Sequence, residues 1–265
     1  MPQVGPNSLV ERFRRPDVRA IALMGSYARG DQGTFSDIDL VLFLKADGPE
    51  LDPETHLIGE TFVVLSQVTP SQVESWFTEP DKATACIAGL RAARALWDPD
   101  GDFSSIQKRA QAFVWDAAMQ ARANAWASRQ MVGWIEEVQK GLEGLRTGDE
   151  GRLLNARYGL SWGLTSVMRV QRGVLITGDN ATYPEVVEHL EADSAWARLS
   201  RKAFGIVDGI GLREQVKAGL RLYVLTAALL ADALKPEDKT LVDEAVKRIG
   251  KELGEAPDRS IEATS

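Results

Sequence analysis

The sequence has a single cysteine, Cys86, and only two histidines. One cysteine cannot form a disulfide within the chain, so a small secreted fold held by disulfides is excluded. We interpret Cys86 as a small buried residue rather than a catalytic thiol, because free cysteine is among the most often buried residue types. This cysteine usage fits a reducing compartment, so we expect a cytoplasmic protein.

Long apolar runs and an excess of basic residues are also missing. No run reaches the roughly 18 apolar residues of a membrane-spanning helix, and residues 1–17 lack the continuous apolar segment of a signal peptide. The net charge is −7. Nucleic-acid binders displace counterions with basic surface, so we expect no nucleic acid and no membrane as a partner. An acidic surface does suit a cationic small molecule.

What is present is the composition of a folded protein with two parts. With 44% apolar and 26% charged residues, the chain can bury a core. Short apolar runs predict an N-terminal part with four or five strands, with a loop over 45–54 and His56 as a loop histidine. The strands are expected over 20–24, 37–44, 61–68 and 91–97.

After Gly101 the pattern changes to helical periodicity, which places a domain boundary near residue 102. We therefore expect domains over 1–102 and 103–253 and a disordered tail over 254–265. The expected helices cover 106–146 (one bent or broken helix, or two), 150–172, 182–204, 211–235 as a buried central helix, and 237–253.

The stretch 20–44 contains the candidate metal-binding and phosphate-binding residues. An apolar run stops at Gly25-Ser26, and eleven residues after Ser26 comes Asp37-Ile38-Asp39, which leads into a second apolar run. Residues two apart on a strand point to the same side, so both carboxylates share one face. Two adjacent carboxylates repel each other unless a cation lies between them, and hard oxygen ligands suit Mg²⁺. Gly25 permits close backbone approach, and Ser26 offers a hydroxyl and an N–H to phosphate.

These residues, GSYARGDQGTFSDIDLVLFL in full, resemble the G-S…D-x-D signature of the nucleotidyltransferase superfamily, and within it the lincosamide and aminoglycoside nucleotidyltransferases. The resemblance covers 20–44 most strongly and weakens through the helical part. It implies an α/β N-terminal domain, a mixed sheet flanked by helices, followed by an all-α C-terminal helical bundle. It also implies ATP or another NTP as co-substrate, two Mg²⁺ ions, a small-molecule antibiotic as acceptor, and a homodimer.

The resemblance assigns roles to particular residues. Asp37 and Asp39 would bind metal and nucleotide, and Gly25 and Ser26 would hold phosphates. Arg29 is a candidate for the phosphate oxygens, with a solvated arginine as the alternative. The family takes a third carboxylate from the strand beside D-x-D, but 61–68 carries none. Glu60, at the entrance of that strand, is therefore the candidate for metal binding or for the general base, with an exposed edge glutamate as the alternative.

The helix expected over 150–172 carries a polar and aromatic face beside its core stripe. Tyr158, Trp162 and Arg169 recur on this face. Tyr and Trp can stack on a ring and Arg can meet phosphate, so these residues are candidate substrate contacts. Packing between helices is the alternative for the two aromatic residues.

Two other functions remain open. The acceptor could be a protein side chain or an RNA end, although a large helical part and the acidic charge disfavour RNA. The fold could also be a nucleotide-binding module without catalysis. The intact Asp37/Asp39 pair argues against that module, and the absence of a third carboxylate over 61–68 keeps it open.

Overall fold

The computed structural model describes residues 5–254, which divide into two compact units. The first unit holds the chain up to Met119 together with a returning segment, Leu175–Ala181. The second unit holds Gln120–Val174 and the chain from Thr182 onward. The division therefore lies beyond the boundary expected near residue 102. The predicted tail lies outside the described residues, apart from Gly254.

The first unit is built on a five-stranded mixed sheet, as the sequence predicts. Its order is β3-β4-β2-β1-β5. The β2 and β4 strands are parallel, and the other neighbouring pairs are antiparallel. The strands are β1 (Val18–Leu23), β2 (Ile38–Leu44), β3 (Glu54–Ile58), β4 (Thr61–Val68) and β5 (Arg94–Trp97).

The β3 strand is absent from the sequence prediction. It is a short edge strand whose residues are mostly exposed, so it has no buried apolar run to mark it. The prediction of a loop histidine is therefore wrong. His56 lies in β3, its Nε2 is 3.1 Å from Oε2 of Glu54, and its ring is 5.1 Å from that of Phe13. The last strand begins later than predicted, because residues 91 and 92 complete α4.

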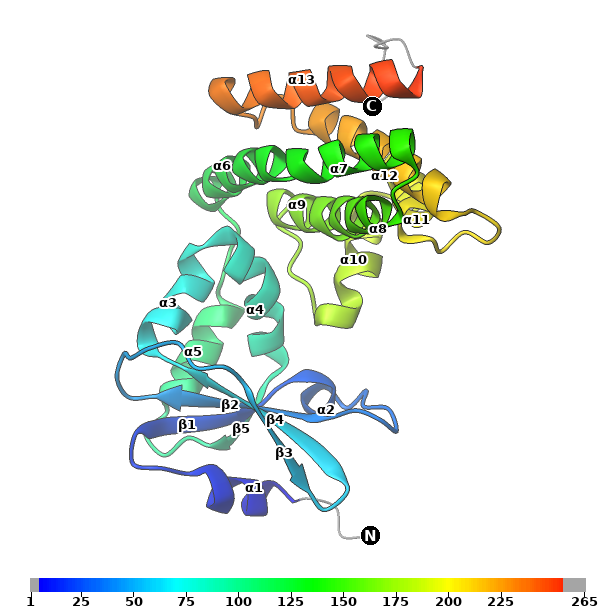
Figure 1. Ribbon diagram of the computed structural model, residues 1–265. Coiled ribbons are helices and arrows are strands. Elements are labelled where there is room, and N and C mark those ends of the chain that lie inside the picture. Colours follow the sequence, from blue (N-terminus) through cyan, green and yellow to red (C-terminus); the bar gives the residue numbers. More distant parts are fainter. Residues whose placement is uncertain (1–4, 255–265) are drawn as a thin grey trace. The chain divides into compact units, whose positions relative to one another are not determined.

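Helices cover both faces of the sheet (Figure 1). One face packs against α1, through Leu9 and Phe13. The other packs against α3, α4 and α5, and its core includes Phe43, Phe77 and Phe103. The helices of this unit are α1 (Pro6–Phe13), α2 (Gly25–Arg29), α3 (Pro70–Thr78), α4 (Pro80–Ala92) and α5 (Asp102–Gln111).

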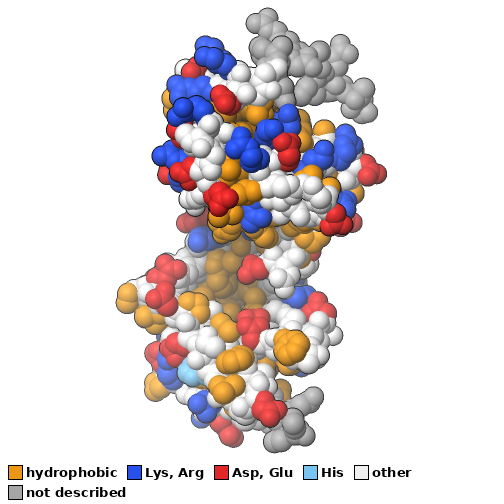
Figure 2. Space-filling view, turned by 45° about the vertical axis from the view of Figure 1, so that its right-hand side comes forward, with side chains coloured by type: hydrophobic (Ala, Val, Ile, Leu, Met, Phe, Trp, Pro, Cys, Tyr) orange, Lys and Arg blue, Asp and Glu red, His pale blue; other side chains and the backbone are white. Residues whose placement is uncertain are grey.

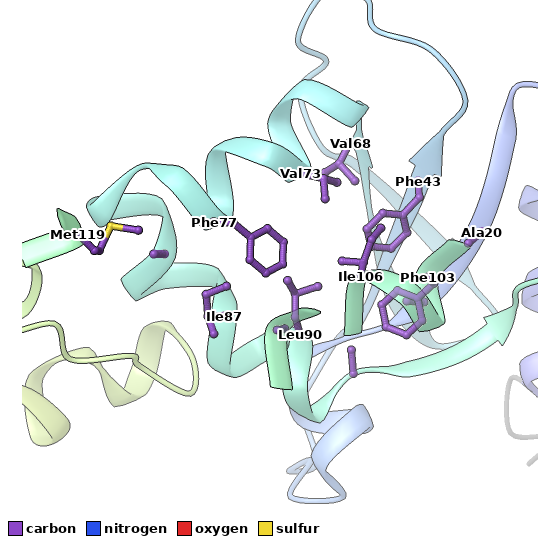
Figure 3. Packing of buried hydrophobic residues seen from close by; sticks show 14 residues of the cluster. Ala20, Phe43, Val68, Val73, Phe77, Ile87, Leu90, Phe103, Ile106 and Met119 are labelled. Atoms are coloured by element: carbon purple, nitrogen blue, oxygen red, sulfur yellow. The ribbon is translucent and has the colours of Figure 1, made fainter. Parts of the chain in front are cut away.

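The core between the sheet and α3, α4 and α5 explains why the first unit extends past residue 102. Figure 3 shows Phe43 of β2 beside Phe103 and Ile106 of α5, and the two phenyl rings are 5.4 Å apart. Burying these apolar side chains on the sheet ties α5 to the first unit. A sequence pattern marks α5 as helical, but it does not show which core the helix joins.

Helices also begin where the local sequence provides caps. Thr69 and Gln72 form a reciprocal capping box, with Gln72 N donating to Thr69 Oγ1 at 3.3 Å and Thr69 N donating to Gln72 Oε1 at 2.9 Å. Pro70 follows at the first helical position, where its missing N–H costs nothing. The end of β4 is thereby turned directly into α3.

The second unit is helical throughout its described residues, apart from the connections. The buried central helix expected over 211–235 is α12, in which Tyr223 donates to Met131 O at 2.9 Å and Thr226 accepts from Trp196 Nε1 at 3.0 Å. The helices are α6 (Ala117–Gly133, whose first three residues belong to the first unit), α7 (Ile135–Thr147), α8 (Glu150–Tyr158), α9 (Leu164–Gln171), α10 (Thr182–His189), α11 (Ala195–Phe204), α12 (Leu212–Leu229) and α13 (Pro236–Leu253).

Several predicted helices are divided. The stretch 106–146 contains the second half of α5 and all of α6 and α7 rather than one or two helices. The prediction of a single helix over 182–204 is wrong, because the chain forms α10 and α11 there. Between them Glu191 adopts a positive φ of 65°, and Ser194 caps α11 by accepting from Ala197 N at 3.1 Å. The stretch 150–172 stays helical but includes a π-helical turn, Gly159–Gly163, between α8 and α9.

Charged side chains of both signs are interspersed on the face of the second unit drawn in the upper part of Figure 2. Many pair within one helix, such as Lys239 with Asp243 at 3.0 Å and Arg248 with Glu244 at 3.0 Å. Such exposed pairs contribute little stability each, about 0.3–0.5 kcal/mol. Among the described residues, no helix has the length and apolar character needed to span a membrane.

Candidate active site

The turn that follows β1 brings Gly25 against Asp39. Met24 N donates to Asp39 O at 2.8 Å, which extends the pairing of β1 with β2 by one residue. Gly25 then adopts a positive φ of 61° and begins α2. A Cβ on Gly25 would lie 2.0 Å from Asp39 Oδ2. Glycine is therefore required twice at this position, for its backbone conformation and for the space that the carboxylate occupies.

The two predicted carboxylates flank the first residue of β2. Ile38 and Leu40 are buried in the core beneath α1, so Asp39 points to the opposite side of the sheet. Asp37, just before the strand, is exposed, whereas Asp39 is half-buried. The structure thus places Asp39 beside Gly25 at the end of β1, with Asp37 two residues earlier in the chain.

The surroundings of Asp39 make its negative charge costly. Burial is the largest cause that raises the pKa of Asp39, followed by the charges of Asp37 and Asp179, whereas Arg29 lowers it. A group in this environment favours a bound cation, because a cation offsets both desolvation and repulsion. The electrostatics therefore fit the metal role that the sequence predicts.

A divalent metal also fits the available ligands. Within residues 5–254, no group of three or more His, Cys, Asp or Glu side chains is arranged to hold a metal ion. Mg²⁺ does not need such a cage, since it keeps several waters and is commonly held by one or two carboxylates together with substrate phosphates. Asp37 and Asp39 offer that number of hard oxygen donors.

Ser26 occupies the first turn of α2. Its carbonyl accepts from Gly30 N at 2.8 Å and from Asp31 N at 3.1 Å. Its hydroxyl makes no hydrogen bond with another described residue. The first N–H groups of a helix also lack partners within the helix. Ser26 can therefore donate to an anionic ligand without giving up an internal contact.

Arg29 uses its guanidinium within the first unit. Its Nε donates to Asp31 Oδ2 at 3.0 Å, and its Nη1 donates to Thr177 O at 3.0 Å. Arg29 is therefore not simply solvated, and its side chain is not reserved for a phosphate ligand. It links α2 to the returning segment Leu175–Ala181.

The remaining predicted site residues belong to other elements of the chain. Glu60 is exposed in the turn between β3 and β4, and it is not among the charges that influence Asp39. Tyr158, Trp162 and Arg169 belong to the second unit. Tyr158 and Trp162 are 65% and 43% exposed, and Trp162 stacks edge-on against Phe204 with ring centroids 4.9 Å apart. Their roles stay predictions.

The sequence prediction missed Asp179, whose charge acts on Asp39. Asp179 is 140 positions further along the chain, between the helices expected over 150–172 and 182–204. No periodicity or motif connects it to the D-x-D strand. Its place depends on contacts between distant segments.

One of the comparisons with known proteins concerns this same part of the chain. Residues 7–86 match the family model described as nucleotidyltransferase domain. Among solved structures, the chain is similar to a nucleotidyltransferase-like protein from Exiguobacterium sibiricum 255-15, with 11% identity and a TM-score of 0.44 over 93% of this chain and 76% of that one. The search among curated proteins found no match. The matched residues include Gly25, Ser26, Asp37 and Asp39, so this site lies in the part of the chain that is similar to a nucleotidyltransferase domain.

Proposed function

We propose that this protein moves a nucleoside monophosphate, AMP from ATP, onto a hydroxyl of a small-molecule antibiotic, either a lincosamide or an aminoglycoside. The observation that carries the transfer is the placement of Asp39 against Gly25, next to Ser26, within a matched nucleotidyltransferase domain. The antibiotic acceptor rests on the resemblance of residues 25–44 to that branch. The net charge of −7 also suits a cationic acceptor.

In this proposal, the chain's own residues mainly bind and orient. Asp37 and Asp39 would hold Mg²⁺, two ions in all, which when bound neutralises phosphate charge and stabilises the charge that develops during transfer. The hydroxyl of Ser26 and the backbone of Gly25 and Ser26 would hold the β- and γ-phosphates. Arg29 would act from its position between α2 and Thr177. Most of the rate enhancement would come from positioning and electrostatics.

The bonds that change define the reaction. The acceptor oxygen forms a bond to the α-phosphorus while the bond from that phosphorus to the bridging oxygen breaks, and pyrophosphate leaves. The proton of the acceptor hydroxyl must go to a base, for which Glu60 is the candidate from the sequence. Tyr158, Trp162 and Arg169 are proposed contacts for the acceptor, which the exposure of the two aromatic residues supports.

The proposed partners are NTP and antibiotic, without nucleic acid. Two copies of the chain would form a homodimer, as the resemblance implies. Light scattering on the purified protein tests this, and a monomeric mass at micromolar concentration would contradict it.

The experiment that tests the function is Mg²⁺-dependent pyrophosphate release from ATP against a panel of lincosamides and aminoglycosides. We expect release that depends on one drug class and that disappears in Asp37→Ala. Asp100→Ala is the matched control, because Asp100 is an exposed acid in a turn of the same unit. Removing the metal with EDTA should also stop release.

The other outcomes identify the alternatives. Binding of ATP without release on any drug would refute the antibiotic acceptor and leave a protein or RNA acceptor, or a binding module without catalysis, in its place. Release that Asp37→Ala does not change would refute the assignment of the site itself.

A further inference from the structure

The returning segment Leu175–Ala181 is anchored on the first unit at several points. Ile176 is buried, and its N–H donates to Thr84 O at 3.0 Å. Leu175 packs against the core that contains α4, and Thr177 O accepts from Arg29 Nη1 at 3.0 Å. A Cβ on Gly178 would lie 3.7 Å from that same Nη1. The backbone is thus held next to α2 up to the residue before Asp179.

The carboxylate of Asp179 is available at this place. Asp179 is exposed and has no hydrogen bond or ion pair with any residue in 5–254. Its charge nevertheless acts on the Asp39 carboxylate, as does the charge of Arg29. The Arg29 link and the close approach of Gly178 place this segment beside α2, and the first residue of α2, Gly25, lies against Asp39.

The strand beside Asp39 offers no acid of its own. In the parallel register, Asp39 is level with Val64 and Ile38 with Val63, so Asp37 is level with Phe62. Val63 and Leu65 are buried beneath α1, and the alternation directs Phe62 and Val64 to the side of Asp39. Phe62 is 58% exposed there. The positions of β4 nearest to the two carboxylates are therefore apolar.

We propose that Asp179 is the general base of the transfer, an inference that rests on the proposed function. Its carboxylate accepts the proton of the acceptor hydroxyl as the oxygen bonds to the α-phosphorus and pyrophosphate leaves. Asp37 and Asp39 would hold the metal, and carboxylates that bind it would not be free to accept that proton. A segment between α9 and α10, rather than strand β4, thus completes the acidic site.

The first experiment tests the placement with the metal alone. Mn²⁺ replaces Mg²⁺ in the full-length protein without nucleotide, and its paramagnetism broadens amide resonances near the ion. We expect broadening at Gly178, Asp179 and Asn180 in the wild type and in Asp179→Ala, and none in Asp39→Asn. Broadening at Gly25 without any at 178–180 would place Asp179 away from the metal pair and overturn the inference.

The second experiment tests the role by chemical rescue. We expect Asp179→Ala to lower the rate of pyrophosphate release by about 10²–10⁴-fold. Its affinity for a non-hydrolysable Mg·ATP analogue should stay within about twofold of wild type, since a base does not hold the nucleotide. Because Asp179 is exposed, added formate can reach the vacated position and should restore the rate at least about tenfold, within the range of general-base catalysis. Asp39→Ala should not respond to formate.

Three results would refute the base role. They are an Asp179→Ala rate close to wild type, a loss of rate that formate does not restore, and formate rescue of Glu60→Ala instead. If no drug supports pyrophosphate release, the same comparison is made on the hydrolysis of ATP to AMP and pyrophosphate. There water is the acceptor, and it must also give a proton to the base. A wild-type protein inactive with every drug and with water would refute the transfer, and the base role with it. An active wild type with an active Asp179→Ala variant refutes the base alone.

Discussion

At the scale of single residues, the space beside Gly25 decides where Asp39 lies. The carboxylate fills the volume that any other residue at position 25 would need, since a Cβ would come within 2.0 Å of Oδ2. This contact joins the end of β1 to the start of β2. A glycine that looks like a phosphate-loop residue in the sequence therefore also positions a carboxylate that we propose as a metal ligand.

Gly25→Ala should lose activity and stability together. The positive φ costs about 1–2 kcal/mol for a residue with a Cβ, and the displaced carboxylate should lower the transfer rate by about 100-fold. Gly101→Ala is the control, because Gly101 also has a positive φ, 75°, but nothing lies within 4 Å of its Cβ position. Urea unfolding and pyrophosphate release measure the two effects. Equal activity in both variants would contradict this account.

Asp39→Asn should abolish turnover without weakening the metal-free fold. The pKa of Asp39 is raised above the ordinary 3.8, so its contribution to stability is fully present below pH 3.8 and is lost as the pH rises through the folded value. Above that value, the buried charge is a cost that the amide removes. In EDTA at pH 7, we expect the variant to unfold at the same or higher urea concentration than wild type.

Magnesium should reverse this order of stability, so that the wild type unfolds at a higher urea concentration than Asp39→Asn. On the proposed function, an ion held by Asp37 and Asp39 would bind the folded wild type and stabilise it by mass action, whereas the variant lacks half of the carboxylate pair. The loss of turnover should be at least about 100-fold, since metal ions supply several kcal/mol of transition-state stabilisation. A variant that is less stable than wild type in EDTA would show that Asp39 has a structural role.

At the scale of elements, the π-helical turn between α8 and α9 lies against α7. A Cβ on Gly163 would be 2.3 Å from Cε2 of Trp134, and one on Gly159 would be 2.5 Å from Cγ of Glu137. Both glycines are buried and have no positive φ. They are needed for close packing of helices rather than for a turn.

Gly163→Ala should destabilise the second unit by about 1–3 kcal/mol, because the rigid indole ring of Trp134 cannot move aside without strain. Gly151→Ala, on the exposed part of α8, is the matched change. There the nearest atom to the new Cβ is Asp149 Oδ1 at 3.4 Å, and alanine favours the helix by about 0.5–1 kcal/mol. The denaturant concentration at the midpoint of unfolding should therefore fall in Gly163→Ala and rise in Gly151→Ala. Midpoints that shift in the same direction would refute the packing argument.

At the scale of the whole molecule, the chain leaves the first unit at Met119 and returns to it for Leu175–Ala181. The returning segment contributes Ile176 to the interior and its backbone to Arg29. Stability of the first unit thus depends on residues far from it in sequence.

Ile176→Ala should lower the free energy of unfolding by about 2–5 kcal/mol, the usual cost of truncating a buried isoleucine. Ile206→Ala is the control at an isoleucine that is 50% exposed, where about 0.5 kcal/mol or less is expected. An Ile176→Ala protein as stable as the control would show that the segment is not anchored.

Hydrogen exchange tests the anchoring separately. The Ile176 amide donates to Thr84 O, so its exchange should accelerate only in a variant that loosens the segment, such as Arg29→Lys.

The sequence by itself determined the local features of this protein. The boundaries of β4 and the turn at Gly25-Ser26 follow from backbone periodicity and from residues that act on their near neighbours. These interactions span a few residues, so a linear pattern records them.

Only the tertiary structure decided the features that depend on distant segments. The edge strand β3 forms because β4 supplies its hydrogen bonds, although its own residues are mostly exposed. The α5 helix joins the first unit because Phe103 meets Phe43. Asp179 comes near Asp39 because Arg29 and Thr84 hold the segment before it. Contacts between residues far apart in the chain leave no periodic trace in the sequence, so packing alone sets them.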